Sequence, residues 1–186
     1  KVGGSVLFPN AEVQLNLRQA GPVVLGPFEN GSAIRKSLAL SAEQVIDEIN
    51  KSKLRGRGGA GFPTGMKWSF CRKAKGRHFL ICNADEGQPG TFKDRLLLTE
   101  AADLLFEGMT VAGYALGAAE GLLYLRAEYA YLLPRLEQVL SRRRRHGLLG
   151  RNIAGREEFD FDIRIQMGAG AYVCGEESAL IESLEG

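Results

Sequence analysis

Five glycines lie between Arg55 and Lys67, in the run Arg-Gly-Arg-Gly-Gly-Ala-Gly-Phe-Pro-Thr-Gly-Met-Lys. A backbone with so few Cβ atoms can approach a flat or phosphorylated ligand closely. Arg55, Arg57 and Lys67 place positive charge on both sides of this backbone, which favours the anionic end of such a ligand. We therefore predict that this glycine loop, residues 55–65, binds a phosphate-bearing cofactor. The alternative is a flexible turn between two elements.

The glycine loop contains the pattern Gly-x-Gly-x-x-Gly at residues 56–61, which is typical of dinucleotide-binding folds when a strand precedes it and a helix follows. Here the preceding residues 41–50 predict a helix, because Ser41 and Gln44 form a capping box and the apolar residues share one helical face. The P-loop pattern fails as well, since Phe62 stands where Gly-Lys-Ser/Thr would have to continue. The sequence therefore predicts a nucleotide-binding loop that is neither an ordinary dinucleotide-binding loop nor a P-loop.

Two further segments place polar residues just past predicted strands. Residues 83–86 contain an amide and two carboxylates after a strand at residues 77–82, and a glycine-rich turn at residues 168–178 follows a strand at residues 159–165. Ligands of open α/β sheets bind outside the carboxyl ends of the strands, so we expect these segments and the glycine loop around one cavity. Amides, carboxylates and one lysine equip such a site to hold a cofactor rather than to act as a nucleophile.

Each candidate residue also has a structural alternative. For Asp85 and Glu86, the alternative is helix capping or a solvated loop. Glu176 and Glu177 stabilise the first turn of a helix without any further function. Aromatic residues such as Phe62 are often part of a core, although a position directly after the glycine run makes burial awkward.

The remaining patterns predict the elements that position these segments. We expect helices at residues 41–50, 66–73, 93–98, 101–116, 129–145 and 176–184, and strands at residues 77–82, 121–126 and 159–165. Strands that alternate with longer helices predict an α/β sandwich with a mainly parallel sheet. Residues 1–40 carry repeated turn signals and are expected to be irregular. We assign residues 1–34 to an irregular N-terminal segment and residues 35–186 to the cofactor-binding domain.

Composition narrows the class of protein. The 186 residues are 45% hydrophobic and 25% charged, with a net charge of +2, as in an ordinary globular domain. The apolar runs are too short to span a membrane, so we expect no direct membrane insertion. Residues 142–145 are four arginines in the last turn of a predicted helix, where they complement the helix dipole and point into water; we expect no nucleic-acid binding. Three cysteines form no metal motif and fit a reducing cytoplasm.

Three segments together resemble one protein family. Residues 56–68 read Gly-Arg-Gly-Gly-Ala-Gly-Phe-Pro-Thr-Gly-Met-Lys-Trp, residues 82–95 read Cys-Asn-Ala-Asp-Glu-Gly-Gln-Pro-Gly-Thr-Phe-Lys-Asp-Arg, and residues 168–183 begin Gly-Ala-Gly-Ala-Tyr-Val-Cys-Gly-Glu-Glu-Ser. In this order they resemble the signatures of the NADH-binding flavoprotein (51 kDa) subunit of respiratory complex I. That family includes the diaphorase subunits of NAD-reducing hydrogenases and NAD-linked formate dehydrogenases. The amino-acid sequence outside the three signatures is more similar to that of the hydrogenase diaphorases.

The resemblance implies a Rossmann-like domain that holds FMN non-covalently, with NADH stacked above it. It implies hydride transfer between NAD(H) and FMN, and then single electrons to iron–sulfur clusters outside this chain. Lys67 and the glycine loop would hold the flavin phosphate, Phe62 and Phe70 would sandwich the adenine, and Glu86 is the candidate catalytic residue. The cofactor-binding residues implied are Gly56, Arg57, Gly58, Gly59, Ala60, Gly61, Phe62, Gly65, Lys67, Phe70, Asn83, Asp85, Glu86, Tyr172, Gly175, Glu176 and Glu177.

The resemblance also sets expectations for the longer protein. We expect this chain to be part of a polypeptide that continues into a ubiquitin-like domain and a cysteine-rich domain that ligates a [4Fe–4S] cluster. The expected partners are iron–sulfur subunits of a complex I-like, hydrogenase or formate dehydrogenase complex, in the cytoplasm or on the cytoplasmic face of a membrane complex. Gln88 stands where many members carry a second acid, so an electrostatic role at that position is in doubt. The alternative function is a nucleotide-binding or assembly scaffold without turnover.

Overall fold

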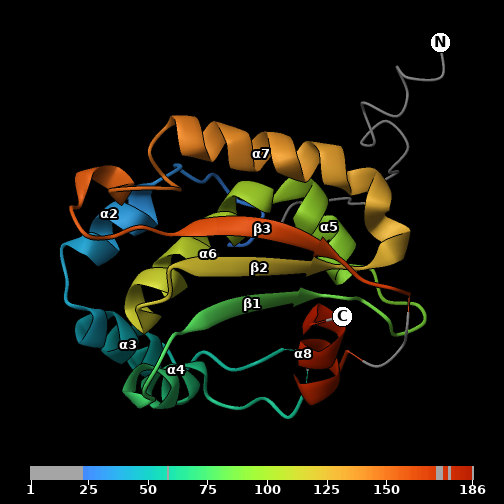
Figure 1. Ribbon diagram of the computed structural model, residues 1–186, viewed down its shortest axis with the longest axis horizontal. Coiled ribbons are helices and arrows are strands. Elements are labelled where there is room, and N and C mark those ends of the chain that lie inside the picture. Colours follow the sequence, from blue (N-terminus) through green and yellow to red (C-terminus); the bar gives the residue numbers. More distant parts are fainter. Residues whose placement is uncertain (1–22, 58, 171–173, 176, 186) are drawn as a thin grey trace.

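The centre of the molecule is a three-stranded parallel sheet with the strand order β1-β2-β3 (Figure 1). The computed structural model describes residues 23–57, 59–170, 174–175 and 177–185. The strands are β1 (Phe79–Ala84), β2 (Glu120–Leu125) and β3 (Asp162–Met167). Ile81 lies opposite Leu122, and Leu122 lies opposite Arg164. The predicted α/β class and parallel sheet are confirmed, although β1 and β3 begin later along the chain than expected.

The two faces of the sheet are covered by different helices. Leu80 and Leu123 belong to the main core, which lies under α5 (Lys93–Glu100), α6 (Ala102–Leu116) and α7 (Leu133–Arg145). Successive side chains of a strand point to opposite faces, so Ile81 and Tyr124 face the other side. There they pack with Leu180 of α8 (Glu177–Glu185), which Figure 1 shows near the carboxyl end of β1.

Helices α3 (Ala42–Lys51) and α4 (Thr64–Lys73) stand on either side of the glycine loop. Both elements of the predicted capping box are present, since the Gln44 amide donates to the Ser41 hydroxyl and the Ser41 amide donates to the Gln44 side chain. Val45 and Ile46 form a second, smaller cluster with Ala115 of α6. The glycine loop is therefore attached to the main domain through α3 and α6.

The expectation that residues 1–40 are irregular is wrong for α2 (Ser32–Leu38), which also spans the boundary that we placed between residues 34 and 35. Its first turn has no side-chain cap of its own, because the N-cap residue is Gly31. Instead, the carboxylate of Glu107, on α6, accepts hydrogen bonds from the amides of Gly31, Ala33 and Ile34 at 2.8, 2.9 and 3.2 Å. This helix has only 7 residues, and the carboxylate that caps it lies 73 to 76 positions away in the sequence. The sequence near residues 32–38 therefore carries little evidence of a helix.

The predicted helix at residues 129–145 is found as a 3-10 segment, η2 (Ala127–Leu132), followed by α7, with Pro134 in the first turn of α7. The expectation that the four arginines point into water is wrong for Arg143, whose side chain is 1% exposed. Three of these arginines instead bind the helix to other parts of the fold. The ion pairs are Arg142 with Asp103, Arg143 with Glu107 at 2.8 Å, and Arg144 with Asp162 at 3.0 Å.

Candidate functional site

The glycine loop is shaped by bonds within its own backbone. The Gly56 amide donates to the Phe62 carbonyl at 3.0 Å, and an antiparallel bridge joins Arg55 to Pro63. The Arg55 guanidinium donates to the carbonyl of Gly61, which has a φ of +69° that favours glycine. These contacts make the loop a narrow hairpin, which Figure 1 draws in teal running from α4 toward the side of the molecule where α8 lies. Gly58 lies outside the described residues.

The backbone of the glycine loop is open to a ligand at its tip. Gly59 and Ala60 are exposed, and a Cβ placed on Gly59 would meet no atom within 4 Å. Gly65 is different, because it is buried and a Cβ there would lie 2.3 Å from Oδ1 of Asn50. One glycine therefore leaves space beside the loop, whereas the other allows the end of α3 to pack against the start of α4.

Large apolar side chains are exposed beside the loop. Phe62 is 50% exposed, and Met66 and Phe70, one helical turn apart on α4, are 45% and 61% exposed. Lys67 lies between them in sequence and is also exposed. Exposed aromatic rings give a ligand apolar surface to contact. Phe62 and Phe70 are thus placed where a ligand can contact them, and their part in binding adenine stays a prediction.

The carboxyl end of β1 is joined to the turn before α8. The side-chain amide of Asn83 donates to the carbonyl of Cys174 at 2.7 Å, and its oxygen accepts from the Asp85 amide at 3.0 Å. Gly175, next along the turn, is exposed. Two of the three predicted segments therefore meet at one edge of the sheet. Tyr172 and Glu176 lie outside the described residues, and of Glu177 only its place at the start of α8 is described.

Glu86 follows Asp85 but is only 4% exposed. Its carboxylate accepts hydrogen bonds from the amides of Asp94 and Arg95, at 3.0 and 3.2 Å, in the first turn of α5. The Tyr129 hydroxyl donates to the same carboxylate at 2.8 Å. Burial raises the pKa of this carboxyl, but the three donors outweigh burial and hold its pKa below the usual value. These contacts are those of a helix cap, and a catalytic role for Glu86 stays a prediction.

Arg126 and Tyr129, which the sequence analysis did not single out, complete the surroundings of Glu86. An Nη atom of Arg126 donates to the Glu86 carbonyl, and the other Nη donates to Glu128 at 2.7 Å. That guanidinium lowers the pKa of the Glu128 carboxyl to about 2. The sequence could have indicated Arg126, because it directly follows the strand β2. The carboxyl ends of neighbouring parallel strands lie at the same edge of a sheet, so a residue after β2 is expected near the residues after β1.

The thiols of Cys82 and Cys174, near this edge of the sheet, are not activated as nucleophiles. Burial raises the pKa of the Cys82 thiol to about 11, and burial also raises the pKa of the Cys174 thiol. A thiol with a raised pKa is a poor nucleophile at neutral pH, because the reactive form is the thiolate. The carboxylates, amides and cations of this edge are therefore the groups available to a ligand.

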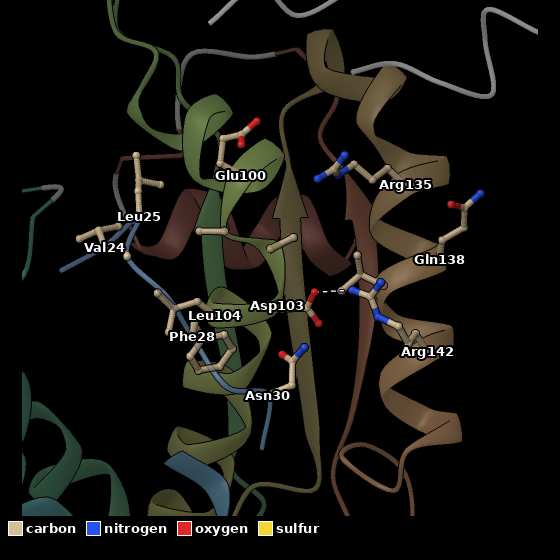
Figure 2. A pocket seen from close by; sticks show the side chains of 14 residues that line it. Val24, Leu25, Phe28, Asn30, Glu100, Asp103, Leu104, Arg135, Gln138 and Arg142 are labelled. Carbon is tan, nitrogen blue, oxygen red and sulfur yellow. Dashed lines mark hydrogen bonds and ion pairs between the residues drawn. The ribbon is translucent and has the colours of Figure 1, made fainter. Parts of the chain in front are cut away.

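A cavity of about 690 Å³ lies elsewhere, between residues 24–30, the junction of α5 and α6, and α7 (Figure 2). Figure 2 shows the ion pair of Asp103 and Arg142 within it, with Arg135 and Glu100 nearby. None of the described residues that line it belongs to the predicted cofactor site. The volume of this cavity therefore neither supports nor contradicts the predicted site.

Comparison with known proteins decides the family. The family described as the Nuo51 FMN-binding domain matches residues 49–186 of this chain, which include all the predicted site residues. The chain belongs to this family.

Relatives of this Nuo51 FMN-binding domain are subunits of larger assemblies. The chain is 56% identical to the NAD-reducing hydrogenase HoxS subunit alpha of Cupriavidus necator, over 97% of this chain and 30% of that protein. It is 51% identical to a subunit of the NADH-quinone oxidoreductase of Aquifex aeolicus, over 83% of this chain and 36% of that protein. A crystal structure of NAD+-reducing [NiFe]-hydrogenase in the H2-reduced state matches with a TM-score of 0.80 and 47% identity, over 93% of this chain and 29% of that chain. The chain thus spans about a third of the length of these relatives.

In the described part of the chain, no helix combines the length and the apolar character that crossing a bilayer requires.

Proposed function

We propose that this chain forms the FMN- and NADH-binding part of an NADH:acceptor oxidoreductase subunit. The proposal rests on the match to the Nuo51 FMN-binding domain. This match covers residues 49–186, which include all three loops predicted from the sequence to bind a cofactor. The names of the relatives, an NAD-reducing hydrogenase subunit and an NADH-quinone oxidoreductase subunit, support the same nucleotide and the same class of reaction.

The glycine loop has the properties that a flavin phosphate requires. Gly59 is exposed, with open space where a Cβ would stand, so the backbone can approach a ligand there. In our proposal, the amides around residues 58–61 and the Lys67 ammonium hold the phosphate by charge-assisted hydrogen bonds. Asn83 and Asp85 line the flavin from the carboxyl end of β1.

The nicotinamide nucleotide is proposed to lie over the same edge. In our proposal, Phe62 and Phe70, whose rings are exposed, sandwich the adenine. Gly175, Glu176 and Glu177 approach the flavin and the nucleotide ribose, and Tyr172 is a further proposed cofactor-binding residue. FMN, when bound, supplies the capacity to accept a hydride from NADH and to release single electrons. The residues of this chain bind and orient the two nucleotides.

The electron partners lie outside this chain in our proposal. The relatives are subunits of multi-subunit enzymes, and this chain spans about a third of their length. We propose that the longer protein ligates a [4Fe–4S] cluster and delivers electrons to iron–sulfur subunits of a complex I-like, hydrogenase or formate dehydrogenase complex.

The proposal is tested by titrating FMN into the flavin-free full-length protein and its Lys67→Ala variant. A charge-assisted hydrogen bond contributes roughly 1.5–3 kcal/mol, so the variant should bind FMN about ten- to a hundredfold more weakly. Lys73→Ala is the matched control, because Lys73 is an exposed lysine at the other end of α4, and it should bind as the wild type does.

Two results would overturn parts of this proposal. Equal dissociation constants for wild type and Lys67→Ala would remove Lys67 from the phosphate site. A full-length protein that binds neither FMN nor NADH would support the scaffold alternative over an oxidoreductase.

A further inference from the structure

Resting on the proposed FMN site, we propose that Arg126 and Tyr129 are positioning residues for it and that they act through Glu86. Neither residue is among the cofactor-binding residues that the sequence suggests. Both follow β2, and both contact the residue that follows Asp85 at the end of β1. In this proposal Glu86 is the point by which the flavin-lining loop is fixed, rather than the catalytic group that the family resemblance implies.

The contacts hold Glu86 by its main chain and by its side chain. Arg126 donates to the Glu86 carbonyl, while the Tyr129 hydroxyl donates to the Glu86 carboxylate at 2.8 Å. The Arg126 guanidinium carbon is 5.9 Å from the centroid of the Tyr129 ring, and the Tyr129 amide donates to the Arg126 carbonyl at 2.9 Å. Arg126 and Tyr129 are therefore arranged as one unit, and they restrain both the position and the direction of the Glu86 residue.

This unit is itself fixed to the sheet. The Arg126 amide donates to the carbonyl of Ala84 at 3.2 Å, continuing the pairing of β2 with β1 by one residue. On its other side, Glu86 is bound to the first turn of α5 through the amides of Asp94 and Arg95. Glu86 thus connects three elements, namely the end of β1, the start of η2 and the start of α5.

The loop beside this point carries the residues proposed to line the flavin. Asp85 lies between Asn83, which accepts from its amide at 3.0 Å, and Gly87, whose amide donates to the Asp85 carbonyl at 2.8 Å. These main-chain contacts of Asp85 reach only two residues along the chain, whereas Glu86 is held by distant elements. Displacing Glu86 would therefore move Asp85 relative to a bound cofactor, and a site is only as well ordered as the groups that support it.

The charge on Glu86 is engaged within the protein. Three donors occupy its two carboxylate oxygens, and the residue is 4% exposed. A carboxylate in this state accepts hydrogen bonds from its neighbours and is poorly placed to exchange a proton with a ligand. Its contribution to the site is therefore the position of the loop.

The experiment uses the full-length protein and measures FMN binding by fluorescence quenching. Tyr129→Phe should weaken FMN binding by about 5- to 20-fold, because it removes a hydrogen bond to a charged group. Tyr131→Phe is the matched control, since Tyr131 lies in the same η2 segment and contacts the Tyr129 ring edge-on, and it should bind FMN as the wild type does. Arg126→Ala should weaken binding by a similar factor, and Arg126→Lys should recover part of the loss.

A double substitution separates positioning through Glu86 from a general loss of stability. If Tyr129 acts through the Glu86 side chain, then adding Tyr129→Phe to Glu86→Ala, which removes the acceptor, should weaken FMN binding no further than Glu86→Ala alone. Independent, multiplying losses would overturn the proposal. Should Tyr129→Phe fail to fold, Arg126→Ala and Arg126→Lys decide the question, because Arg126 donates to the main-chain carbonyl of Glu86 and an unchanged FMN affinity in both variants would overturn the proposal.

The pH dependence of FMN binding provides a readout that a merely structural role would not change. Affinity should fall as the pH drops through the pKa of Glu86, and Tyr129→Phe should move this fall to higher pH, since the carboxylate loses a donor. The charged and titratable groups that face Glu86 and remain in this variant are Lys93, Asp94 and Arg95 of α5, Asp85 of its own loop, and Arg126 and Glu128 before η2 and within it.

The outcomes distinguish the two proposals. A wild-type protein that does not bind FMN contradicts the proposed function itself. A wild-type protein that binds FMN, together with Tyr129→Phe and Arg126→Ala variants of unchanged affinity and unchanged pH profile, overturns only the positioning role.

Discussion

The side-chain amide of Asn83 donates to the main-chain carbonyl of Cys174 at 2.7 Å, across 91 residues of sequence. The same side chain accepts a hydrogen bond from the Asp85 amide, so one residue fixes the loop after β1 and the turn before α8. Two of the segments that resemble the flavoprotein family are therefore joined by a single side chain. Through this contact, the position of the turn before α8 depends on the position of β1 in the sheet.

Removing this connection should loosen the turn before α8. Asn83→Ala loses two hydrogen bonds between a side chain and the backbone, each of which stabilises a protein by about 0.5–1.5 kcal/mol. Asn83→Asp should cost more than the alanine variant, because it places a carboxylate against the Cys174 carbonyl while keeping the acceptor for Asp85. Chemical denaturation of the full-length protein measures both. An aspartate variant as stable as the wild type would contradict the contact.

The ion pair of Glu107 and Arg143 should be indispensable to the stability of the domain. Both side chains are 1% exposed, and Glu107 also caps α2. Glu107→Gln removes the buried counter-charge of Arg143 and leaves its guanidinium only the more distant carboxylate of Asp103, at 3.6 Å, so we expect the free energy of unfolding to fall by about 3–5 kcal/mol. Glu137→Gln, at a position of α7 outside the core, is the control and should have little effect. Thermal and denaturant unfolding measure the difference, and equal stabilities of the two variants would refute it.

Two glycines of the same loop should respond to alanine in different ways. In Gly65→Ala the new Cβ would be 2.3 Å from Oδ1 and 2.9 Å from the backbone nitrogen of Asn50, so we expect a loss of roughly 1–3 kcal/mol in the free energy of unfolding. In Gly59→Ala the new methyl group meets no protein atom within 4 Å, so the melting temperature should not change. If FMN lies against this backbone, Gly59→Ala should nevertheless weaken FMN binding. A Gly59→Ala variant with unchanged FMN affinity would place the cofactor elsewhere.

The choice between NADH and NADPH should depend on Glu177, or otherwise on Glu176. Glu177 begins α8, shortly after the Cys174 carbonyl that Asn83 contacts. In the proposed site, a carboxylate at this position accepts hydrogen bonds from the adenosine ribose. A 2′-phosphate would be repelled by that charge. Glu177→Gln should therefore raise the NADPH:NADH ratio of kcat/KM by at least about tenfold, mainly through KM.

Glu185→Gln, at the far end of α8, is the control for this measurement. Steady-state kinetics with both nucleotides give the ratio. If Glu177→Gln and the double variant with Glu176→Gln both leave it unchanged, the ribose lies in another part of the site.

Local sequence patterns were sufficient to predict most of the helices and strands of this chain. The capping box of Ser41 and Gln44 and the glycine run each act within a few residues, so they could be found without a structure. The same is true of the parallel sheet, because apolar strands alternate with longer helices. The family resemblance rested on equally local signatures, and the family match confirmed it.

The tertiary structure decided the roles of the charged residues. Glu107 and Glu86 each cap a helix whose own N-cap residue, Gly31 or Phe92, provides no side-chain cap, and Arg143 is buried although its neighbours in sequence suggested an exposed face. A carboxylate or a guanidinium can be exposed, paired or capping with the same local sequence around it. Which of these it becomes depends on the elements that the fold brings within about 3 Å of it, and most of those elements are distant in the sequence.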